Sequence, residues 1–200
     1  MKLAIVRGHR KGSQGAVAAD GTTEWQWAGW LGGRIMTRAL ELGHAAQVFE
    51  RPNGSSYTRN LAELTAEVNA WRPTLVLSLH FDASPNGQPW SGSTGLYWPG
   101  EDGGKPVDRD GRTYAIQLAA ACSRGIGIRD RGARGQAKSW NDAWLFILRD
   151  TDAPAVILET HFGLADHVRA MAALTEPAPG TNAGKLADAI VRALPPVRTT

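Results

Sequence analysis

The chain has 200 residues, of which 42% are hydrophobic and 20% are charged, and its formal net charge is +3. This length fits one domain, and the apolar fraction is too high for an intrinsically disordered chain. The single cysteine excludes an internal disulfide, and the lack of about 18 consecutive apolar residues predicts no transmembrane segment.

The N-terminus is too poor in apolar residues to predict a secretory signal peptide. Only Leu3 to Val6 separate Lys2 from Arg7, whereas the central part of a signal needs about 7–15 apolar residues. We therefore expect synthesis in the cytoplasm. The positive net charge suits a polyanionic partner and does not by itself choose between an anionic glycan and a nucleic acid.

The predicted elements of the first half alternate between strand and helix. Thr23 to Gln26 form the capping-box pattern that starts a helix, and Gly43 is a typical helix end. In chain order, we predict a strand at 2–7, a helix from 24 to 42, a strand at 46–50, a helix at 60–71 and a strand at 74–79.

The second half continues the alternation. In chain order, we predict a strand at 94–98, a helix at 114–126, strands at 145–148 and 154–158, and helices at 164–174 and 185–194. Strands that alternate with helices predict a single α/β domain at 1–194, with a mostly parallel sheet of about six strands flanked by helices. A flexible tail is expected at 195–200.

Titratable residues gather where the predicted strands end. His9, His80 and Glu159 each follow a predicted strand, and Glu24 lies at a helix start. Because the carboxyl ends of parallel strands share one edge of the sheet, we expect these side chains to converge. Two neutral imidazoles and one carboxylate are a ligand set for a catalytic zinc ion, and a further carboxylate can move protons. The residues therefore predict one zinc ion held by His9, Glu24 and His80, with Glu159 as general base and acid.

The same residues lie in segments that resemble a known family. The segments are Gly8-His9, Glu24, Arg59, Asn69, Leu77-Ser78-Leu79-His80, Leu148-Arg149, Pro154 through Thr160, and Phe162. In order and spacing, from Lys2 to about Leu194, they resemble the catalytic domain of the zinc-dependent N-acetylmuramoyl-L-alanine amidases.

The resemblance implies a twisted mixed sheet covered by helices. It also implies hydrolysis of the amide that joins the lactyl group of muramic acid to L-alanine in peptidoglycan. Glu24 falls at the position of the family's ligand glutamate, and Glu159 falls at the position of its catalytic glutamate.

At four places along the chain, residues depart from those usual in that family. Val6-Arg7 stand in place of Asp-Pro, Arg10 in place of a glycine, Phe81-Asp82 in place of Ala-Asn, and His161 in place of a glycine. None of these changes removes a ligand, and together they predict an unusual substrate rim.

Two of these positions have alternative interpretations. Because strand side chains alternate, Glu159 and His161 are expected to point the same way. In a functional interpretation, His161 donates to the oxyanion or steers the Glu159 proton. In the alternative, which we favour, His161 is a rim residue that faces solvent. Asp82 either orients the zinc-bound His80 imidazole or is a turn residue before Pro85.

Arginines and tryptophans in predicted loops are candidates for substrate contacts. The residues concerned are Arg124, Arg129, Arg131, Arg134, Trp90, Trp98, Trp140 and Trp144. Arg131 either contacts a substrate carboxylate or belongs to a solvated loop, which we favour. The tryptophans either stack on sugar rings or pack under loops. The arginine segment lacks the interleaved aromatic residues of a nucleic-acid site, so we expect no nucleic-acid partner.

Other residues have structural interpretations. Cys122 lies on the apolar face of a predicted helix and is expected to be a core residue, not a nucleophile. We expect His44 and His167 at the surface, and Trp27, Trp30 and Trp71 in the core.

The leading hypothesis is a monomeric zinc amidase that cleaves peptidoglycan. The apparent lack of a leader favours the lytic role of an endolysin, made in the host cytoplasm and acting on the wall after release. The alternative is a zinc-dependent deacylase or carboxypeptidase that acts on a small N-acyl amino acid or peptide. A non-catalytic basic module that binds cell wall or nucleic acid is a third hypothesis, which the four-residue set opposes.

Overall fold

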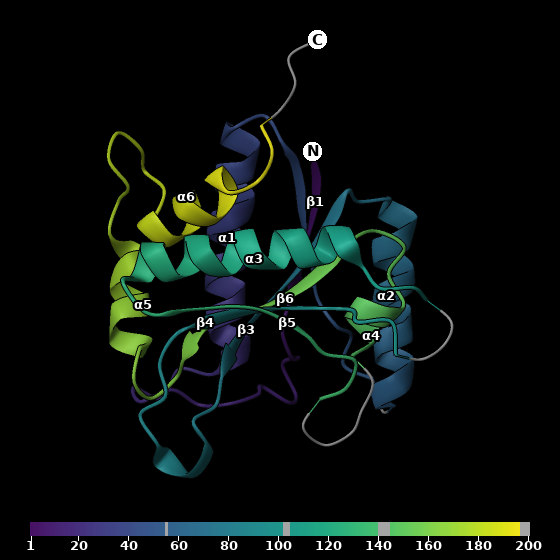
Figure 1. Cartoon of the computed structure of the whole chain (residues 1–200), viewed down its shortest axis with the longest axis horizontal. Coiled ribbons are helices and arrows are strands. Elements are labelled where there is room, and N and C mark those ends of the chain that lie inside the picture. The colour runs from purple at the N-terminus through teal and green to yellow at the C-terminus, as the bar shows by residue number, and fades with distance from the viewer. Residues whose placement is uncertain (55, 102–104, 140–144, 197–200) are drawn as a thin grey trace.

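One six-stranded sheet forms the centre of the protein in the computed structural model, which describes residues 1–54, 56–101, 105–139 and 145–196 (Figure 1). The strands are β1 (Lys2–Arg7), β2 (Ala45–Phe49), β3 (Leu75–Asp82), β4 (Ser93–Tyr97), β5 (Asp130–Gly135) and β6 (Ala155–Phe162). The helices of the described residues are α1 (Glu24–Glu41), α2 (Tyr57–Trp71), α3 (Arg109–Ile126), α4 (Phe146–Arg149), α5 (His167–Thr175) and α6 (Lys185–Arg192), with a short 3-10 turn at Pro85–Gly87.

The directions of the strands decide which loops meet. The order across the sheet is β2-β1-β3-β6-β4-β5, and β1, β2, β3 and β6 run parallel to one another. β4 runs antiparallel to β6, and β5 runs parallel to β4. The starts of β4 and β5 therefore lie at the same edge as the ends of β1, β3 and β6. The prediction of a mostly parallel, mixed sheet of about six strands is confirmed.

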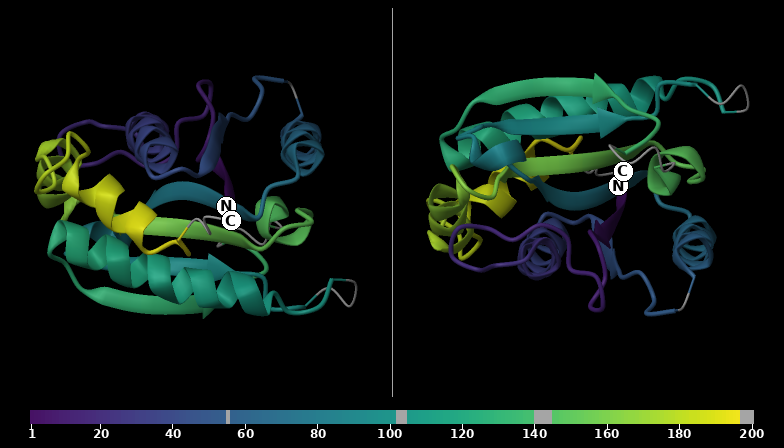
Figure 2. Two further views of the ribbon diagram at one scale, coloured as in Figure 1. Left: turned by 90° about the horizontal axis from the view of Figure 1, so that it is seen from above. Right: turned by 90° about the horizontal axis from the view of Figure 1, so that it is seen from below.

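Helices cover both faces of the sheet, and the alternation of side chains along the strands gives each face its own core. Leu3 and Ile5 of β1 pack with residues of α1, α3, α5 and α6, whereas Ala4 and Val6 pack with residues of α2 and α4. Figures 1 and 2 show α2 and α4 together on one side of the molecule, away from α1, α5 and α6. Since the central strands are buried on both faces, they appear in the sequence as nearly continuous apolar runs.

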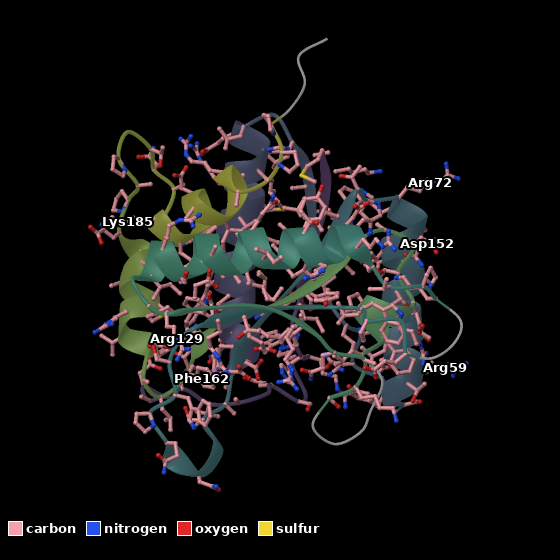
Figure 3. All side chains as sticks on the ribbon, viewed as in Figure 1. Arg59, Arg72, Arg129, Asp152, Phe162 and Lys185 are labelled. Atoms are coloured by element: carbon pink, nitrogen blue, oxygen red, sulfur yellow. The ribbon has the colours of Figure 1, made fainter. Side chains whose placement is uncertain are left out.

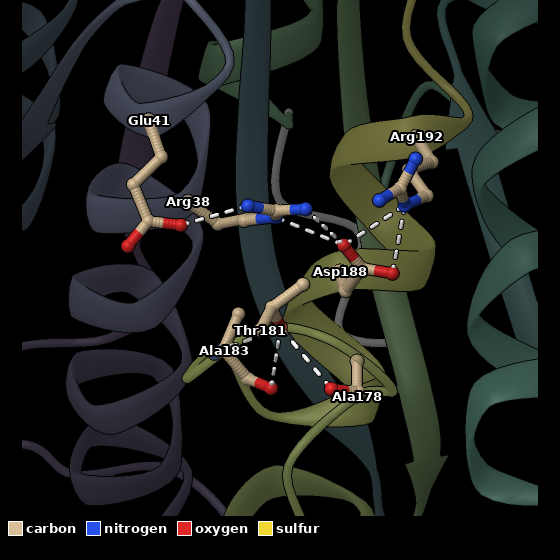
Figure 4. Close-up of polar contacts among 7 residues, drawn as sticks. All are labelled: Arg38, Glu41, Ala178, Thr181, Ala183, Asp188 and Arg192. Atoms are coloured by element: carbon tan, nitrogen blue, oxygen red, sulfur yellow. Dashed lines mark hydrogen bonds and ion pairs between the residues drawn. The ribbon is translucent and has the colours of Figure 1, made fainter.

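An ion-pair network joins α1 to α6 (Figure 4). Arg38 donates from Nε to Asp188 Oδ1 at 2.9 Å and from Nη1 to Glu41 Oε2 at 2.8 Å. Arg192 donates to the same Asp188 carboxylate from the next turn of α6. The Arg38 side chain is buried, so this pairing fixes the last helix against the helix that begins at Glu24.

Two predicted elements are wrong. The segment predicted as a strand at 145–148 contains α4, a single helical turn that buries Ile147 and Leu148. A short apolar run fits a helix or a strand equally well, so the pattern could not separate them. The arginine-rich segment predicted as a loop contains β5. This strand lies at the edge of the sheet, where partly exposed residues carry no apolar signature.

The core expectation holds for Trp27, which is fully buried, and fails for Trp30, which is 45% exposed on the outer side of α1. Trp71 is partly buried against Phe49, and Trp98 packs under a loop, where its Nε1 donates to the Lys105 carbonyl.

Some sequence predictions fall on residues that the structure does not describe. Trp140, Trp144 and the last four residues of the expected tail lie outside the described ranges, and the boundary at 194 stays a prediction. Within the described ranges, no helix combines the length and the apolar character needed to cross a membrane.

Candidate active site

Three segments bring His9, Glu24 and His80 to the edge where β1 and β3 end. His9 follows β1 and has a φ of 60°, in the left-handed region that residues other than glycine rarely adopt. Thr23 closes a capping box at the start of α1, which makes Glu24 the first residue of the helix. His80 lies near the end of β3. The left-handed backbone at His9 is strained, and strain of this kind persists only where surrounding contacts hold it and is frequent at functional sites.

The Glu24 carboxylate lies between two imidazoles. Its Oε2 is 2.9 Å from His9 Nε2, and its Oε1 is 3.0 Å from His80 Nδ1. Burial alone would raise the pKa of Glu24, but hydrogen bonds from the two rings outweigh it and hold the pKa below its usual range. Burial lowers the pKa of His80. An ionised carboxylate beside a neutral imidazole is the state in which these groups bind a metal ion.

The backbone closes tightly around the same carboxylate. Ala16 N donates to Glu24 Oε2 at 2.9 Å, and Phe81 N donates to Oε1 at 3.3 Å. A Cβ on Gly15 would lie 2.5 Å from Glu24 Oε2, and the φ of Gly15 is 78°, so only glycine fits this position.

The donor set fits one zinc ion. One ligand atom from each of His9, Glu24 and His80 lies within 4.8 Å of the other two. Two ring nitrogens and one carboxylate oxygen match the donors of catalytic zinc sites and leave one coordination position for water or substrate. The structure thus brings together the three residues that the sequence predicted as ligands.

Glu159 lies beside this cluster in an unusual environment. It is in register with His80 across the β3–β6 ladder, and its Oε2 is buried without a hydrogen-bond partner among the described residues. Burial, followed by the charges of Asp82 and Glu24, raises the pKa of Glu159 well above its usual value. A carboxyl group with a raised pKa is suited to take up a proton and release it again near neutral pH.

A β-bulge overturns the expected direction of His161. The register runs from His80–Glu159 to Asp82–Phe162, so two residues of β6 face Phe81 alone, and the alternation that would align His161 with Glu159 is broken. His161 is fully buried, and its ring meets that of Trp27 edge-on, 4.7 Å between centroids. The prediction of a solvent-facing rim residue is wrong.

The two histidines expected at the surface are also buried. The ring of His167 stacks on His161 with centroids 5.2 Å apart, and its Nδ1 lies 2.9 Å from His161 Nε2. His44 is 6% exposed and lies 3.1 Å from the N-terminal amine. Trp27 and Phe81, which also pack on His167, and Met1, which contacts His44, are distant in the sequence, so local composition gave no signal of this burial.

An open pocket of about 800 Å³ lies at the edge where β4 and β5 start. Its lining residues are Gln88, Pro89, Trp90, Ser91, Arg129 and Arg131. Figure 3 labels Arg129 and Phe162, which lie at this end of the sheet. The antiparallel pairing of β4 with β6 brings these loops to the site. No local sequence motif predicts this pairing.

Arg131 links the pocket to the carboxylates. Its guanidinium lies 4.9 Å from the centroid of the Phe162 ring and 5.7 Å from that of Trp90, and Nη1 is 3.9 Å from Asp82 Oδ2. Burial raises the pKa of Asp82, and the charge of Arg131 opposes that rise. Among the described residues, no hydrogen bond joins Asp82 to His80, whose Nδ1 contacts Glu24 instead.

Asp166, a residue that the sequence did not single out, fixes the wall of the pocket. It is buried and accepts hydrogen bonds from Ser91 Oγ at 2.7 Å and from Gly92 N at 2.9 Å. These bonds attach the loop that carries Trp90 to the start of α5. Trp90 itself is 50% exposed, which leaves its ring accessible to a ligand.

Comparison with known protein families identifies the family of this chain. Residues 3–195 match the profile of the N-acetylmuramoyl-L-alanine amidases. The chain belongs to this family. The enzyme is therefore an N-acetylmuramoyl-L-alanine amidase, a hydrolase of peptidoglycan. A comparison with curated proteins gave no match.

The amidase shares its fold with solved catalytic domains. The catalytic domain of the CD27L endolysin targeting Clostridia difficile has a TM-score of 0.72 and 23% identity, over 96% of both chains. AmiC2 of Nostoc punctiforme has a TM-score of 0.71 and 18% identity, over 96% of this chain and 94% of the other. CwlV from Bacillus (Paenibacillus) polymyxa var. colistinus has a TM-score of 0.70 and 16% identity, over 96% of both. At these identities the likeness shows the fold alone.

The single cysteine of the amidase has no part in this site. Cys122 is fully buried on α3, its Sγ donates to the Thr160 carbonyl at 3.4 Å, and burial raises the pKa of the thiol. A thiol that stays protonated is a poor nucleophile. The prediction of a core residue is confirmed.

Burial of His161 predicts a loss of stability in acid. Burial lowers its pKa from 6.5 to about 3, so between these values the unfolded amidase binds a proton that the folded one does not. This residue therefore lowers the free energy of unfolding by about 1.4 kcal/mol for each pH unit of acidification. In His161→Phe, urea unfolding should show a loss between about pH 6 and pH 4 that is smaller by ~2 kcal/mol. Equal losses in the two proteins would show that His161 is protonated in the folded state.

Proposed function

We propose that the enzyme is a zinc-dependent amidase that cleaves the bond between N-acetylmuramic acid and L-alanine, with Glu159 as general base and acid. One observation carries the proposal: an ionised Glu24 lies between two imidazoles, next to a carboxyl group whose pKa is raised. His9 Nε2, His80 Nδ1 and one Glu24 oxygen would hold the ion.

When bound, a zinc ion supplies a Lewis acid that polarises the scissile carbonyl and lowers the pKa of water at the site. The Glu159 carboxylate accepts the proton of the attacking water and then delivers it to the nitrogen of the leaving L-alanine. Its raised pKa suits both transfers, since a carboxyl group of ordinary pKa would hold the proton too weakly to deliver it efficiently.

Replacing Glu159 should separate catalysis from metal binding. Glu159→Gln keeps the size of the side chain and removes the proton acceptor. Turnover should fall by about 10²–10⁴-fold or more, while zinc content stays near one per chain. His9→Ala and His80→Ala should lose both. The measurements are metal analysis and the release of new L-alanine amino groups from purified cell walls.

The matched control is Glu63→Gln, on the exposed surface of α2, which should keep zinc and turnover. Loss of zinc in Glu159→Gln would instead indicate that Glu159 is a zinc ligand. Retained turnover with zinc still bound would show that Glu159 does not transfer the proton.

We further propose that the pocket beside the site receives the peptide stem of the substrate. Peptide stems of peptidoglycan carry carboxylates. The contacts of Arg131 with Phe162 and Trp90 are cation–π contacts that use no N–H hydrogen bond, and Asp82 at 3.9 Å is beyond hydrogen-bond distance. The N–H groups of Arg131 are therefore suited to a substrate carboxylate, and Arg129 adds a second positive charge to the pocket.

Arg131→Ala tests this assignment on a soluble muramoyl peptide. We expect KM to rise by about 10–100-fold with little change in kcat, because a charge-assisted contact to the substrate is lost. Amidating the stem carboxylates should weaken the wild-type enzyme by a similar factor and leave the variant unaffected. Arg112→Ala, on the exposed side of α3, is the control. Full additivity of the mutation and the amidation would refute a direct contact.

We also propose a lytic role. The fold similarity to the catalytic domain of the CD27L endolysin supports it, and the net charge of +3 suits attachment to an anionic envelope. Production of the enzyme inside a bacterium, together with a membrane-permeabilising protein, should make the culture clear. The same pair with Glu159→Gln should not. Undisturbed growth with the active enzyme, confirmed active in the extract, would argue for a remodelling role instead.

A further inference from the structure

A chain of polar contacts runs through the core behind the site, and no step of the proposed mechanism uses it. Thr160 Oγ1 lies 2.9 Å from His161 Nδ1, and His161 Nε2 lies 2.9 Å from His167 Nδ1. The chain ends at Asp20, whose Oδ1 is 3.2 Å from His167 Nε2, although the two are not aligned for a hydrogen bond. The threonine and both histidines are buried, so their protons must be matched within the protein.

The Asp20 carboxylate sets the direction of this chain. A carboxylate only accepts, so it favours the His167 tautomer that carries hydrogen on Nε2 and leaves Nδ1 as an acceptor. His161 then donates from Nε2 and accepts at Nδ1, which makes the Thr160 hydroxyl the donor. Burial lowers the pKa of both histidines, in agreement with two neutral rings.

The Thr160 hydroxyl has a competing partner in the active site. The carbonyl oxygen of His80 lies 2.9 Å from Thr160 Oγ1, and Trp27 Nε1 donates to the same Oγ1 at 3.0 Å. Because a hydroxyl has one hydrogen, Thr160 can donate to only one of the two acceptors, His80 O or an unprotonated His161 Nδ1. With His161 Nδ1 as an acceptor, the Thr160 hydroxyl donates to His161 instead of to His80 O. The tautomers of the two histidines therefore control the contact between Thr160 and the backbone of a proposed zinc ligand.

The other end of the chain lies in the loop 10–23, which joins His9 to Glu24. In this loop Ala16 N donates to Glu24 Oε2 at 2.9 Å, and Ala19 N donates to the carbonyl of Gly163 at 3.0 Å. The contact between Asp20 and His167 is a second attachment of the loop to the segment that follows β6. A shift of the loop would therefore displace the Glu24 carboxylate.

We propose that His161 and His167 are positioning residues that tie the loop 10–23 to β6 and so hold Glu24 in place relative to Glu159. The inference rests on the proposed function for the roles of these two glutamates. Apolar side chains would fill the same core space without the cost of burying polar groups. The connected contacts from Thr160 through both histidines, with the Asp20 carboxylate at their end, favour one arrangement of the loop over its alternatives.

The first test reads the tautomers directly. In protein labelled with ¹⁵N-histidine, both His161 and His167 should be neutral at pH 7, with hydrogen on Nε2 and not on Nδ1. A Nδ1–H tautomer of either ring, or a doubly protonated ring, would overturn the proton assignment and the proposal with it.

The second test asks whether the chain of contacts holds the loop. In His161→Phe, which keeps the ring volume and removes both bonds, amide hydrogen exchange at Ala16 and Ala19 should be at least about tenfold faster, and zinc should dissociate faster. His161→Gln, whose amide can still donate to His167, should restore part of the protection. His44→Gln replaces a buried histidine outside the chain and should leave these amides unchanged.

Exchange at Ile5, in the core of β1, separates local loosening from general destabilisation. If amide exchange became faster by the same factor at Ile5 and in the loop, His161 would act only through packing, and the proposal would be overturned. If His161→Phe does not fold, Asp20→Ala replaces it, because the Asp20 side chain is 47% exposed. That variant should lose the preference for Nε2–H at His167. All these readings are taken without substrate, so they stand apart from the outcome of the amidase assays.

Discussion

The site depends on one buried carboxylate. Glu24 is taken out of water, yet two imidazoles and two backbone N–H groups keep it ionised. These four partners come from three parts of the chain: the left-handed turn at His9, the loop at Ala16 and the end of β3. An unpaired charge in this position would be strongly destabilising, so the surrounding elements are held to the arrangement that pairs it.

Strand direction supplies the second constraint. Parallel β1, β3 and β6 bring His9, His80 and Glu159 to one edge of the sheet, where Glu24 joins them from the start of α1, and a single antiparallel pairing brings the starts of β4 and β5 to the same edge. His9, His80 and Glu159 thus lie at strand ends, whereas the pocket is lined by the loop that carries Trp90 and by the start of the edge strand β5. This division suits a hydrolase, because the chemistry needs fixed geometry and the recognition of a peptide stem tolerates loop variation.

A bulge in β6 links these two features to the core. Its extra residue turns His161 away from the site and into contact with Trp27 and His167, directly behind the strand that carries Glu159. His161 is therefore not a rim residue. It belongs to a row of buried polar contacts that ends at Asp20, in the loop before Glu24. The departure from the glycine usual at this position therefore has its effect inside the protein, not at the substrate rim.

The class of fold and the order of most elements could be predicted from the amino-acid sequence alone. The sequence also predicted four site residues that the structure brings to one edge of the sheet, and their roles stay predictions. It could do so because buried central strands leave continuous apolar runs, and because His9, His80 and Glu159 directly follow such runs. It mistook α4 for a strand and β5 for a loop, since a single turn and an exposed edge strand leave no periodicity. The burial of His44, His161 and His167 and the place of Arg131 beside the site could not be read from the sequence. The burial of His161 follows a register shift, the place of Arg131 follows an antiparallel pairing, and His44 contacts the N-terminal amine. All of these are properties of contacts between distant segments and not of local sequence.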